Sequence, residues 1–292
     1  MRHLVFFIMT SVSTVFGQML DNREGAAFSD KPFFSPEFIK INKIRSLNGQ
    51  FTYKKPGDAM KNTQYKYVYQ FDTLGRLVAS YETRKDDGTK DTTWNIYAYA
   101  PDNTLIEYKK GDGKGFTATL FDYDTNMRII RERYARDYID SLKKPHRTVL
   151  NSESMRYEVG DSSIKKTIYN SYDLPYMHEF TYYNSLGYRT EKRQQLIMTT
   201  GVTSYKYAYN EKGLLASVKT FTQDEVKPSE ESIYLYDDHG NLTEKQYYRN
   251  GVYITETEMI YNEKSKLLTY VLTRDVATNF IMILSFKNYS FY

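Results

Sequence analysis

One short phrase recurs along this chain and constrains its fold more than any other feature. An aromatic residue is followed by Asn or Asp, then by Gly, and then by Leu, as in "AYNEKGLL" and "LYDDHGNL". A repeated phrase of this kind indicates a protein built from stacked units. The aromatic residues of the clear copies are Phe71, Tyr183, Tyr209, Tyr236 and Tyr261, of which the last four lie 26, 27 and 25 residues apart, and weaker copies contain Tyr99 and Tyr123.

Each unit is typical of a β-hairpin. Alternate residues of a strand point to opposite faces, so Tyr205, Tyr207 and Tyr209 share one face, and Lys206 and Ala208 share the other. The Asn or Asp and the Gly favour a turn, because Asx side chains bond the local backbone and Gly tolerates a positive φ. We therefore expect turns at 72–75, 184–187, 210–213 and 237–240, with Gly75, Gly187, Gly213 and Gly240 as their structural glycines.

Three units lack a glycine at the corresponding turn position. Asn103 stands there in one unit, and Asn tolerates the same backbone region. Met127 and Ser265 stand there in two others. For these two we expect turns of a different type.

The repeats predict an all-β fold in which serial antiparallel hairpins (a meander) form an extended, curved sheet. Residues 61–292 form this repeat domain, with an insertion near 135–152, and residues 18–60 form a lead-in segment. In the lead-in, Ser35 as N-cap and Pro36 as first helical residue predict a short helix that buries Phe38, Ile41 and Ile44. Residues 43–53 are also compatible with a strand.

The phrase Tyr-Asp/Asn-x-x-Gly-x-Leu resembles the YD repeats of RHS proteins. The best matches are "YDDHGNLTEKQYY" from Tyr236 and "FDTLGRLVASYET" from Phe71, and the resemblance covers about residues 65–275. In that family the repeats form strand pairs that coil into long sheets or shells of secreted or surface proteins. The resemblance therefore implies an exported β-repeat protein. It does not imply that family's enclosed toxin, because its Asp-Pro-x-Gly-Leu core motif is missing here.

The first 17 residues are typical of a secretory signal peptide. Arg2 and His3 precede the apolar run "LVFFIMTSVSTVF", which is too short to span a membrane as a helix of about 20 residues. The end of the run, "VFGQ", resembles leader ends of Bacteroidota exports, so we expect cleavage between Gly17 and Gln18. The chain has no Cys, which excludes disulfides and lipid attachment to a cysteine. We expect an exported protein of the periplasm, cell surface or medium, without transmembrane helices.

No motif for catalysis, cofactor binding or metal binding stands out. The four histidines are scattered, and His178 and Glu179 would face opposite sides of a strand. Asp122, Asp124 and Asn126 have the spacing that begins a calcium loop, but the Gly and Glu that complete it are absent. The net charge of +4 is spread over intermixed acidic and basic residues. We expect no metal, no cofactor and no nucleic-acid partner.

The main functional hypothesis is a non-enzymatic binding or scaffolding protein. Tyrosine rows suit contacts with carbohydrate or another envelope protein, because Tyr offers area and a hydroxyl at low entropy cost. The candidate face comprises Tyr205, Tyr207, Tyr209, Tyr234 and Tyr236, and it is equally compatible with a packed core. The alternatives are a secreted enzyme with dispersed carboxylates and an outer-membrane β-barrel. Lys66 and Lys245 weigh against the barrel, because they place charges on both strand faces.

Overall fold

The computed structural model describes residues 17–292 except 84–91, 112–114, 141 and 224, so the predicted signal peptide lies outside the described residues apart from Gly17. These described residues form one short helix and an 18-stranded sheet. Their bounds are α1 Pro36–Ile41, β1 Ile44–Lys54, β2 Lys61–Phe71, β3 Leu77–Thr83, β4 Thr92–Tyr99, β5 Leu105–Gly111, β6 Phe116–Tyr123, β7 Ile129–Ile139, β8 Pro145–Val159, β9 Ser163–Tyr169, β10 Pro175–Tyr183, β11 Arg189–Leu196, β12 Val202–Tyr209, β13 Leu215–Thr222, β14 Glu230–Tyr236, β15 Leu242–Arg249, β16 Val252–Tyr261, β17 Leu268–Asp275 and β18 Ile281–Phe291.

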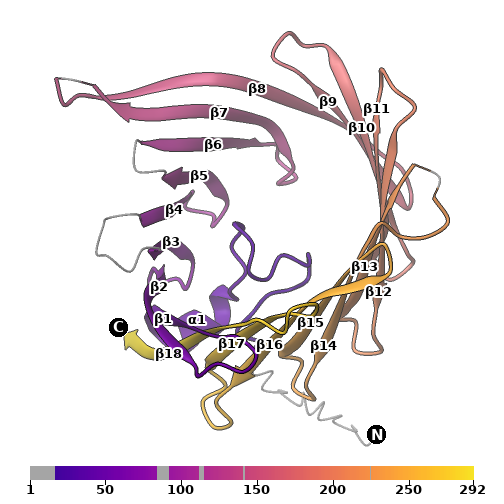
Figure 1. The fold of residues 1–292 in the computed structure, drawn as a ribbon. Helices are drawn as coiled ribbons and strands as arrows, with labels where there is room; N and C mark the ends of the chain where they lie inside the picture. The colour runs from indigo at the N-terminus through magenta and orange to yellow at the C-terminus, as the bar shows by residue number, and fades with distance from the viewer. Residues whose placement is uncertain (1–16, 84–91, 112–114, 141, 224) are drawn as a thin grey trace, which may run out of the picture.

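The strands form a closed barrel (Figure 1). Every strand pairs antiparallel with the next one in the chain, which confirms the predicted all-β meander. The sheet does not stay open, because β1 pairs with both β2 and β18: Leu47 lies opposite Tyr69 on one side and opposite Tyr289 on the other. The lead-in strand thus joins the first hairpin to the last and leaves no free edge.

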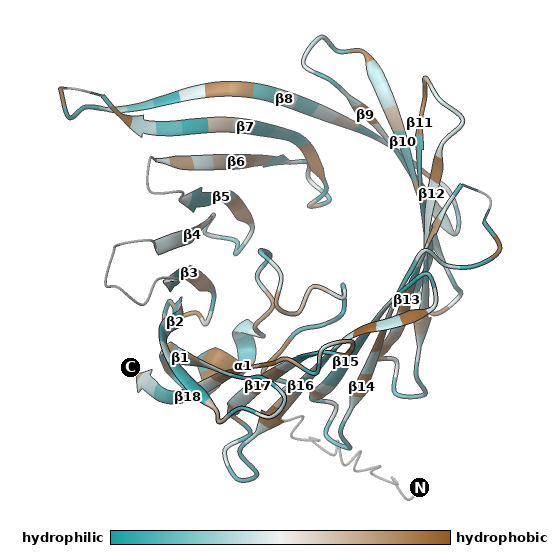
Figure 2. Cartoon of the chain, viewed as in Figure 1, coloured by the Kyte–Doolittle hydropathy of each residue, from teal (hydrophilic) through white to brown (hydrophobic). Residues whose placement is uncertain are grey.

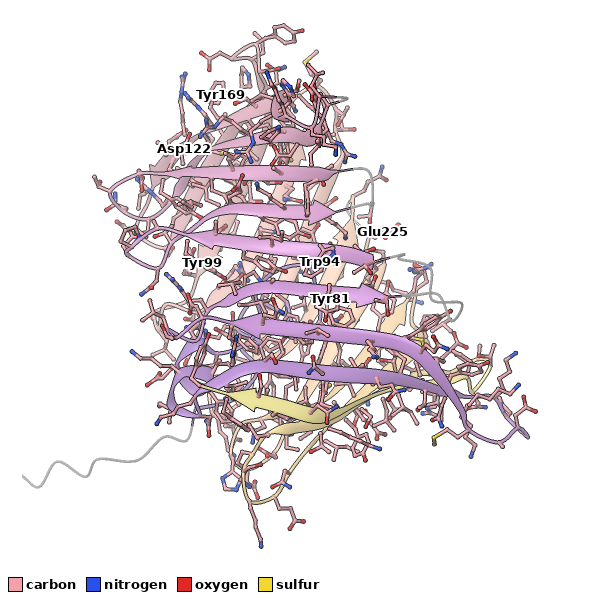
Figure 3. The ribbon with its side chains drawn as sticks, turned by 90° about the vertical axis from the view of Figure 1, so that its left-hand side faces the viewer. Tyr81, Trp94, Tyr99, Asp122, Tyr169 and Glu225 are labelled. Carbon is pink, nitrogen blue, oxygen red and sulfur yellow. The ribbon has the colours of Figure 1, made fainter. Side chains whose placement is uncertain are left out.

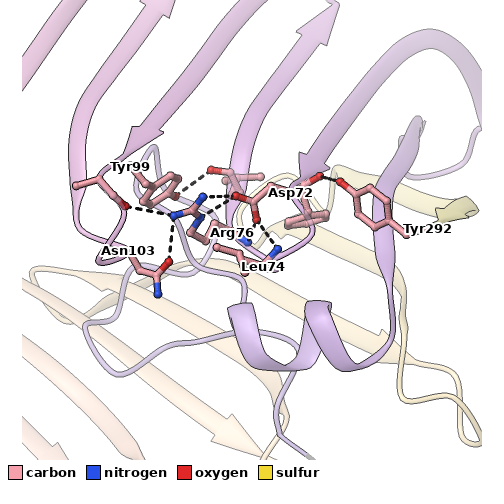
Figure 4. Close-up of polar contacts among 9 residues, drawn as sticks. Asp72, Leu74, Arg76, Tyr99, Asn103 and Tyr292 are labelled. Carbon is pink, nitrogen blue, oxygen red and sulfur yellow. Dashed lines mark hydrogen bonds and ion pairs between the residues drawn. The ribbon is translucent and has the colours of Figure 1, made fainter.

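The hairpin turns share one hydrogen-bond pattern, shown for Asp72 in Figure 4. The N–H of Asp72 donates to the Arg76 carbonyl, and its Oδ1 accepts from the N–H groups of Leu74 and Arg76. The second residue before the return strand has a positive φ, namely 84° at Gly75, 80° at Gly187, 74° at Gly213 and 85° at Gly240.

Two turns without glycine were expected to differ in type. The Met127 turn does not differ, because Met127 adopts a φ of 62° and Asp124 repeats the bonds made by Asp72. The turn that contains Ser265 is one residue longer, with its positive φ of 57° at Lys266. The Asx residue therefore directs the turn even where the left-handed position is not glycine.

Recurrent tyrosines bond most of the hairpins to the hairpin before them. Their phenol groups donate to the backbone carbonyl of a residue at the start of the return strand in the preceding hairpin. These bonds join Tyr99 to Leu77 (2.9 Å), Tyr123 to Leu105 (2.8 Å), Tyr157 to Ile129 (2.7 Å), Tyr209 to Arg189 (3.0 Å), Tyr236 to Leu215 (2.8 Å), Tyr261 to Leu242 (2.8 Å) and Tyr289 to Leu268 (2.5 Å). The repeated aromatic is usually tyrosine because its hydroxyl is used.

The residues before β1, 17–43, lie inside the barrel and are called the N-terminal segment (Figure 1). Ser35 caps α1, since its side chain accepts from the Phe38 N–H, and Pro36 is the first helical residue. The helix is shorter than expected. It buries Phe38 and Ile39, whereas Ile41 is 69% exposed and Ile44 begins β1.

The hydrophobic core lies between the N-terminal segment and the inner wall of the barrel. Phe34 contacts Tyr69 and Phe71 of β2, with ring centroids 4.8 and 5.1 Å apart. Met19 of the segment is fully buried and lies against Leu268 of β17. The barrel is therefore filled on one side by its own leading residues rather than by the meander alone.

The outer wall is strongly charged, and hydrophilic residues run along the strands in Figure 2. Ion pairs join neighbouring strands there, including Lys219 with Glu231, and Arg274 with Glu256.

The segment expected as an insertion, 135–152, is the far end of the β7–β8 hairpin. Within the described residues, no helix has the length and apolar character needed to cross a membrane.

Candidate functional site

The five tyrosines of the predicted binding face all lie on the inner wall. Tyr205, Tyr207 and Tyr209 belong to β12, and Tyr234 and Tyr236 belong to β14. The structure divides them between two cavities beside the N-terminal segment. Tyr209 and Tyr236 line one of about 280 Å³, and Tyr205, Tyr207 and Tyr234 line another of about 290 Å³.

Most of these tyrosines have structural contacts. The Tyr236 hydroxyl donates to the Leu215 carbonyl and accepts from the Asn22 side chain of the N-terminal segment. Tyr234 is 4% exposed, and its hydroxyl lies 3.4 Å from the Gly25 carbonyl. Burial raises the pKa of Tyr236 to about 12, so its phenol stays neutral. Tyr205 lies outside the core and lines a cavity, so it is the most available of the five for a ligand.

A third cavity of about 410 Å³ lies between the N-terminal segment and strands β1, β2 and β15–β18; we call it the Lys245 cavity. Its wall combines hydroxyl groups with apolar side chains. The hydroxyls come from Ser29, Tyr67, Tyr69, Tyr247, Thr255, Thr257 and Thr273, and the apolar surface comes from Ala27, Phe28, Phe51, Val271, Met282 and Leu284.

Lys245 is the uncompensated charge of this cavity. The other charged lining residue, Asp30, accepts an ion pair from Lys110 at 2.6 Å. Among the residues that the structure describes, Lys245 forms no ion pair, and its Nζ lies 5.9 Å from the centroid of the Tyr234 ring. Burial lowers the pKa of Lys245, which reflects the cost of keeping a cation there without a partner.

Lys192 lies on the inner wall at the neighbouring cavity of about 290 Å³, which Tyr205 lines. Unlike Lys245, it has a carboxylate partner. Its Nζ lies 3.9 Å from Glu179 and 4.6 Å from the Tyr205 ring centroid. Burial alone would raise the pKa of Glu179, but hydrogen bonds from Lys166 and Gln194 outweigh it and lower that pKa. A ligand at Lys192 would have to compete with this network, whereas a ligand at Lys245 would not.

The other residues considered for chemistry are engaged or separated. Glu179 faces the lumen, whereas His178 contacts Thr167 at 3.1 Å on the opposite face of β10. Asp122 pairs with Arg133, and Asp124 pairs with Arg128 within its turn. The described part of the chain holds no group of three or more His, Asp and Glu side chains placed to bind a metal ion.

One sequence signal pointed to Lys245. It stands in phase with Tyr247 on β15, so it had to share the face of a tyrosine row. That the face is interior, and that no carboxylate of the described residues lies within ion-pair distance of Lys245, depends on the closure of the barrel.

Two solved structures of porin-like proteins, from Bacteroides uniformis and Bacteroides vulgatus, are similar to this chain. They have 9% and 11% sequence identity, with TM-scores of 0.37 and 0.33, and the matches cover 84% and 82% of this chain and 98% and 96% of those chains. TcdB2-TccC3 matches with 13% identity and a TM-score of 0.23 over 74% of this chain and 15% of its own length. Neither a protein-family model nor a curated protein matches the chain. None of these likenesses identifies a ligand.

Proposed function

We propose that this protein is an exported β-barrel of the cell envelope that binds a small organic anion in its lumen and catalyses no reaction. The observation that carries the proposal is Lys245, a cation at the wall of a cavity of about 410 Å³ that forms no ion pair with any described residue. An anionic group would pair with Lys245, and the hydroxyls of Thr255 and Thr257 would supply further hydrogen bonds.

The volume and the lining of the cavity also suit a small organic anion. Its volume lies within the range of small-molecule sites, about 300–1,000 Å³. Phe51, Val271 and Leu284 offer an apolar surface beside the polar groups. A sugar acid or an aromatic acid presents both an anionic group and an apolar ring face, and therefore matches both halves of the wall.

The ligand can be tested by titration calorimetry with glucuronate and benzoate, and with glucose and benzyl alcohol as uncharged counterparts. We expect the acids to bind and Lys245→Met to weaken binding at least tenfold, because a hydrogen bond to a charged group contributes about 1.5–3 kcal/mol. Lys245→Arg should retain most of the affinity. Lys206→Met, on the outward face of β12, is the matched control and should bind like the wild type.

Equal binding of acids and their neutral counterparts would contradict the proposal, as would equal affinities of Lys245→Met and wild type. Chemical conversion of either acid during incubation, followed by mass spectrometry, would refute the non-enzymatic part. Intact mass of the exported protein tests the location, with Gln18 expected as the first residue.

An outer-membrane barrel is a second candidate, because a closed barrel with an even number of antiparallel strands is also that architecture. The charged outer wall favours water over lipid, since each Arg or Lys on a lipid-facing surface costs about 2–4 kcal/mol at the bilayer midplane. We expect the protein to be released from the envelope without detergent. Retention in carbonate-washed membranes would favour the membrane barrel.

A further inference from the structure

A large groove lies on the outer wall, away from the lumen. It has a volume of about 990 Å³ and is bordered by β4–β8; we call it the Trp94 groove. Trp94 of β4 is the only tryptophan of the chain and is 36% exposed. Figure 3 shows Trp94 and Tyr81 side by side on the outer face of the wall. Their ring centroids are 4.5 Å apart, so together they form an aromatic platform.

The platform remains accessible because a glycine lies beside it. Gly111 of β5 is buried next to the platform, and a Cβ there would come within 2.9 Å of the Phe116 ring and 3.3 Å of the Trp94 Cβ. A side chain at this position would therefore fill the floor of the groove. The aromatic surfaces of Trp94 and Phe116 are left facing a common space.

The polar wall of the groove consists of charges that neutralise one another. Arg147 of β8 donates from Nε to Asp137 Oδ1 at 2.6 Å and from Nη2 to Glu107 Oε1 at 2.5 Å. Lys109 lies 3.0 Å from Asp137 and 3.7 Å from Glu107. The hydrogen bond from Arg147 lowers the pKa of Asp137 to about 2, so the pairs stay ionised and matched. Among the described residues of this wall, each charge is therefore matched by an opposite one, and none is left to attract an ion.

We propose that the Trp94 groove binds an uncharged oligosaccharide. The apolar face of a sugar ring would stack on Trp94, as polar ligands with an apolar face do on aromatic rings. The sugar hydroxyls would form hydrogen bonds with donors and acceptors of the charged wall that are still available. One of these is the Arg147 Nη1 group, which has no partner among the described residues. The volume of the groove exceeds that of the Lys245 cavity, in keeping with a ligand of more than one ring.

Binding at this second site does not depend on the luminal site, and it can be followed by the fluorescence emission of Trp94. An array of neutral and acidic glycans first identifies a glycan that binds. The Trp94 emission is then measured while that glycan is titrated into the protein. We expect a neutral oligosaccharide to bind and to shift the emission. By calorimetry, Trp94→Ala should weaken binding at least tenfold and Trp94→Phe less, while both keep the wild-type thermal transition. Lys245→Met should leave this binding unchanged.

Tyr253→Ala provides the matched control, because Tyr253 stacks on Tyr248 at 4.8 Å on another part of the outer wall. It should bind the glycan like the wild type. The proposal is overturned if no neutral glycan on the array binds, if only acidic glycans bind, or if Trp94→Ala binds equally well. It is also overturned if ultracentrifugation reveals a dimer that Trp94→Ala or Ile139→Ser dissolves, since the groove would then hold a second copy of the chain.

Discussion

At the scale of single residues, the turn glycines show how one backbone conformation can have two different surroundings. Gly75 and Gly187 have nearly the same φ, 84° and 80°. A Cβ on Gly187 would meet nothing within 4 Å, whereas a Cβ on Gly75 would lie 2.0 Å from the Pro36 carbonyl oxygen and 2.8 Å from the Lys40 nitrogen. Helix α1 therefore rests directly on the Gly75 turn.

We expect Gly187→Ala to cost about 1–2 kcal/mol of unfolding free energy, because a side chain disfavours the left-handed region. Gly75→Ala should cost about 1–3 kcal/mol more, since α1 must move as well. Gly187→Asn should be close to wild type, because Asn tolerates this region. Urea midpoints measure all three. Equal losses for the two alanine variants would mean that α1 does not press on the turn.

Gly213 is a less suitable position for this comparison. A Cβ there would lie 2.2 Å from the Tyr188 hydroxyl, so any substitution would combine a backbone effect with a packing effect.

At the scale of elements, the tyrosine bonds give the repeat its cohesion. A hairpin joins its neighbour through the strand ladder, and the phenol adds a side-chain bond to the start of the preceding return strand. Tyr261 illustrates this well, because it packs against the core and donates to the Leu242 carbonyl at 2.8 Å. Burial raises the pKa of Tyr261 well above its usual value, so the donor is permanently protonated.

Tyr261→Phe should lower the unfolding free energy by about 0.5–1.5 kcal/mol, because it removes one hydrogen bond and leaves the ring in place. Tyr172→Phe is the control, since Tyr172 is 83% exposed, and it should have no effect. Chemical denaturation followed by circular dichroism compares the two. If both variants unfold at the same denaturant concentration, the phenol bond contributes nothing to stability.

At the scale of the whole molecule, the N-terminal segment and the barrel wall form one core. Phe34 of the segment is 4% exposed and packs on Tyr69 and Phe71, while ion pairs join the segment to distant strands, as between Glu24 and Arg189. The wall therefore depends on the segment for much of its buried apolar surface.

Phe34→Ala should destabilise the wall as well as the segment, by about 3–5 kcal/mol, because it leaves a cavity in their shared core. The emission of Trp94, which lies on β4, measures unfolding of the wall. Ile41→Ala in the same segment is the control, since Ile41 is 69% exposed. An unchanged Trp94 midpoint in Phe34→Ala would show that the segment unfolds independently.

The amino-acid sequence was sufficient to predict the features that depend on neighbouring residues. The spacing of the aromatic residues, the Asx and Gly positions and the alternation along each strand predicted serial hairpins, the turn positions and a shared face for Tyr205, Tyr207 and Tyr209. It also placed the N-cap at Ser35. These features are local, because a turn and a strand face are set within a few residues.

The curvature of the hairpins and the face that lies inside could be read only from the folded barrel. Closure requires β1 to pair with β18, across contacts such as Ser46 with Ser290, which no local period encodes. Both faces of the strands carry polar residues, so alternation alone could not show which one would meet the N-terminal segment. The isolation of Lys245 and the pairing of charges around Trp94 follow from that choice, because both depend on which strands become neighbours and on what fills the space between them.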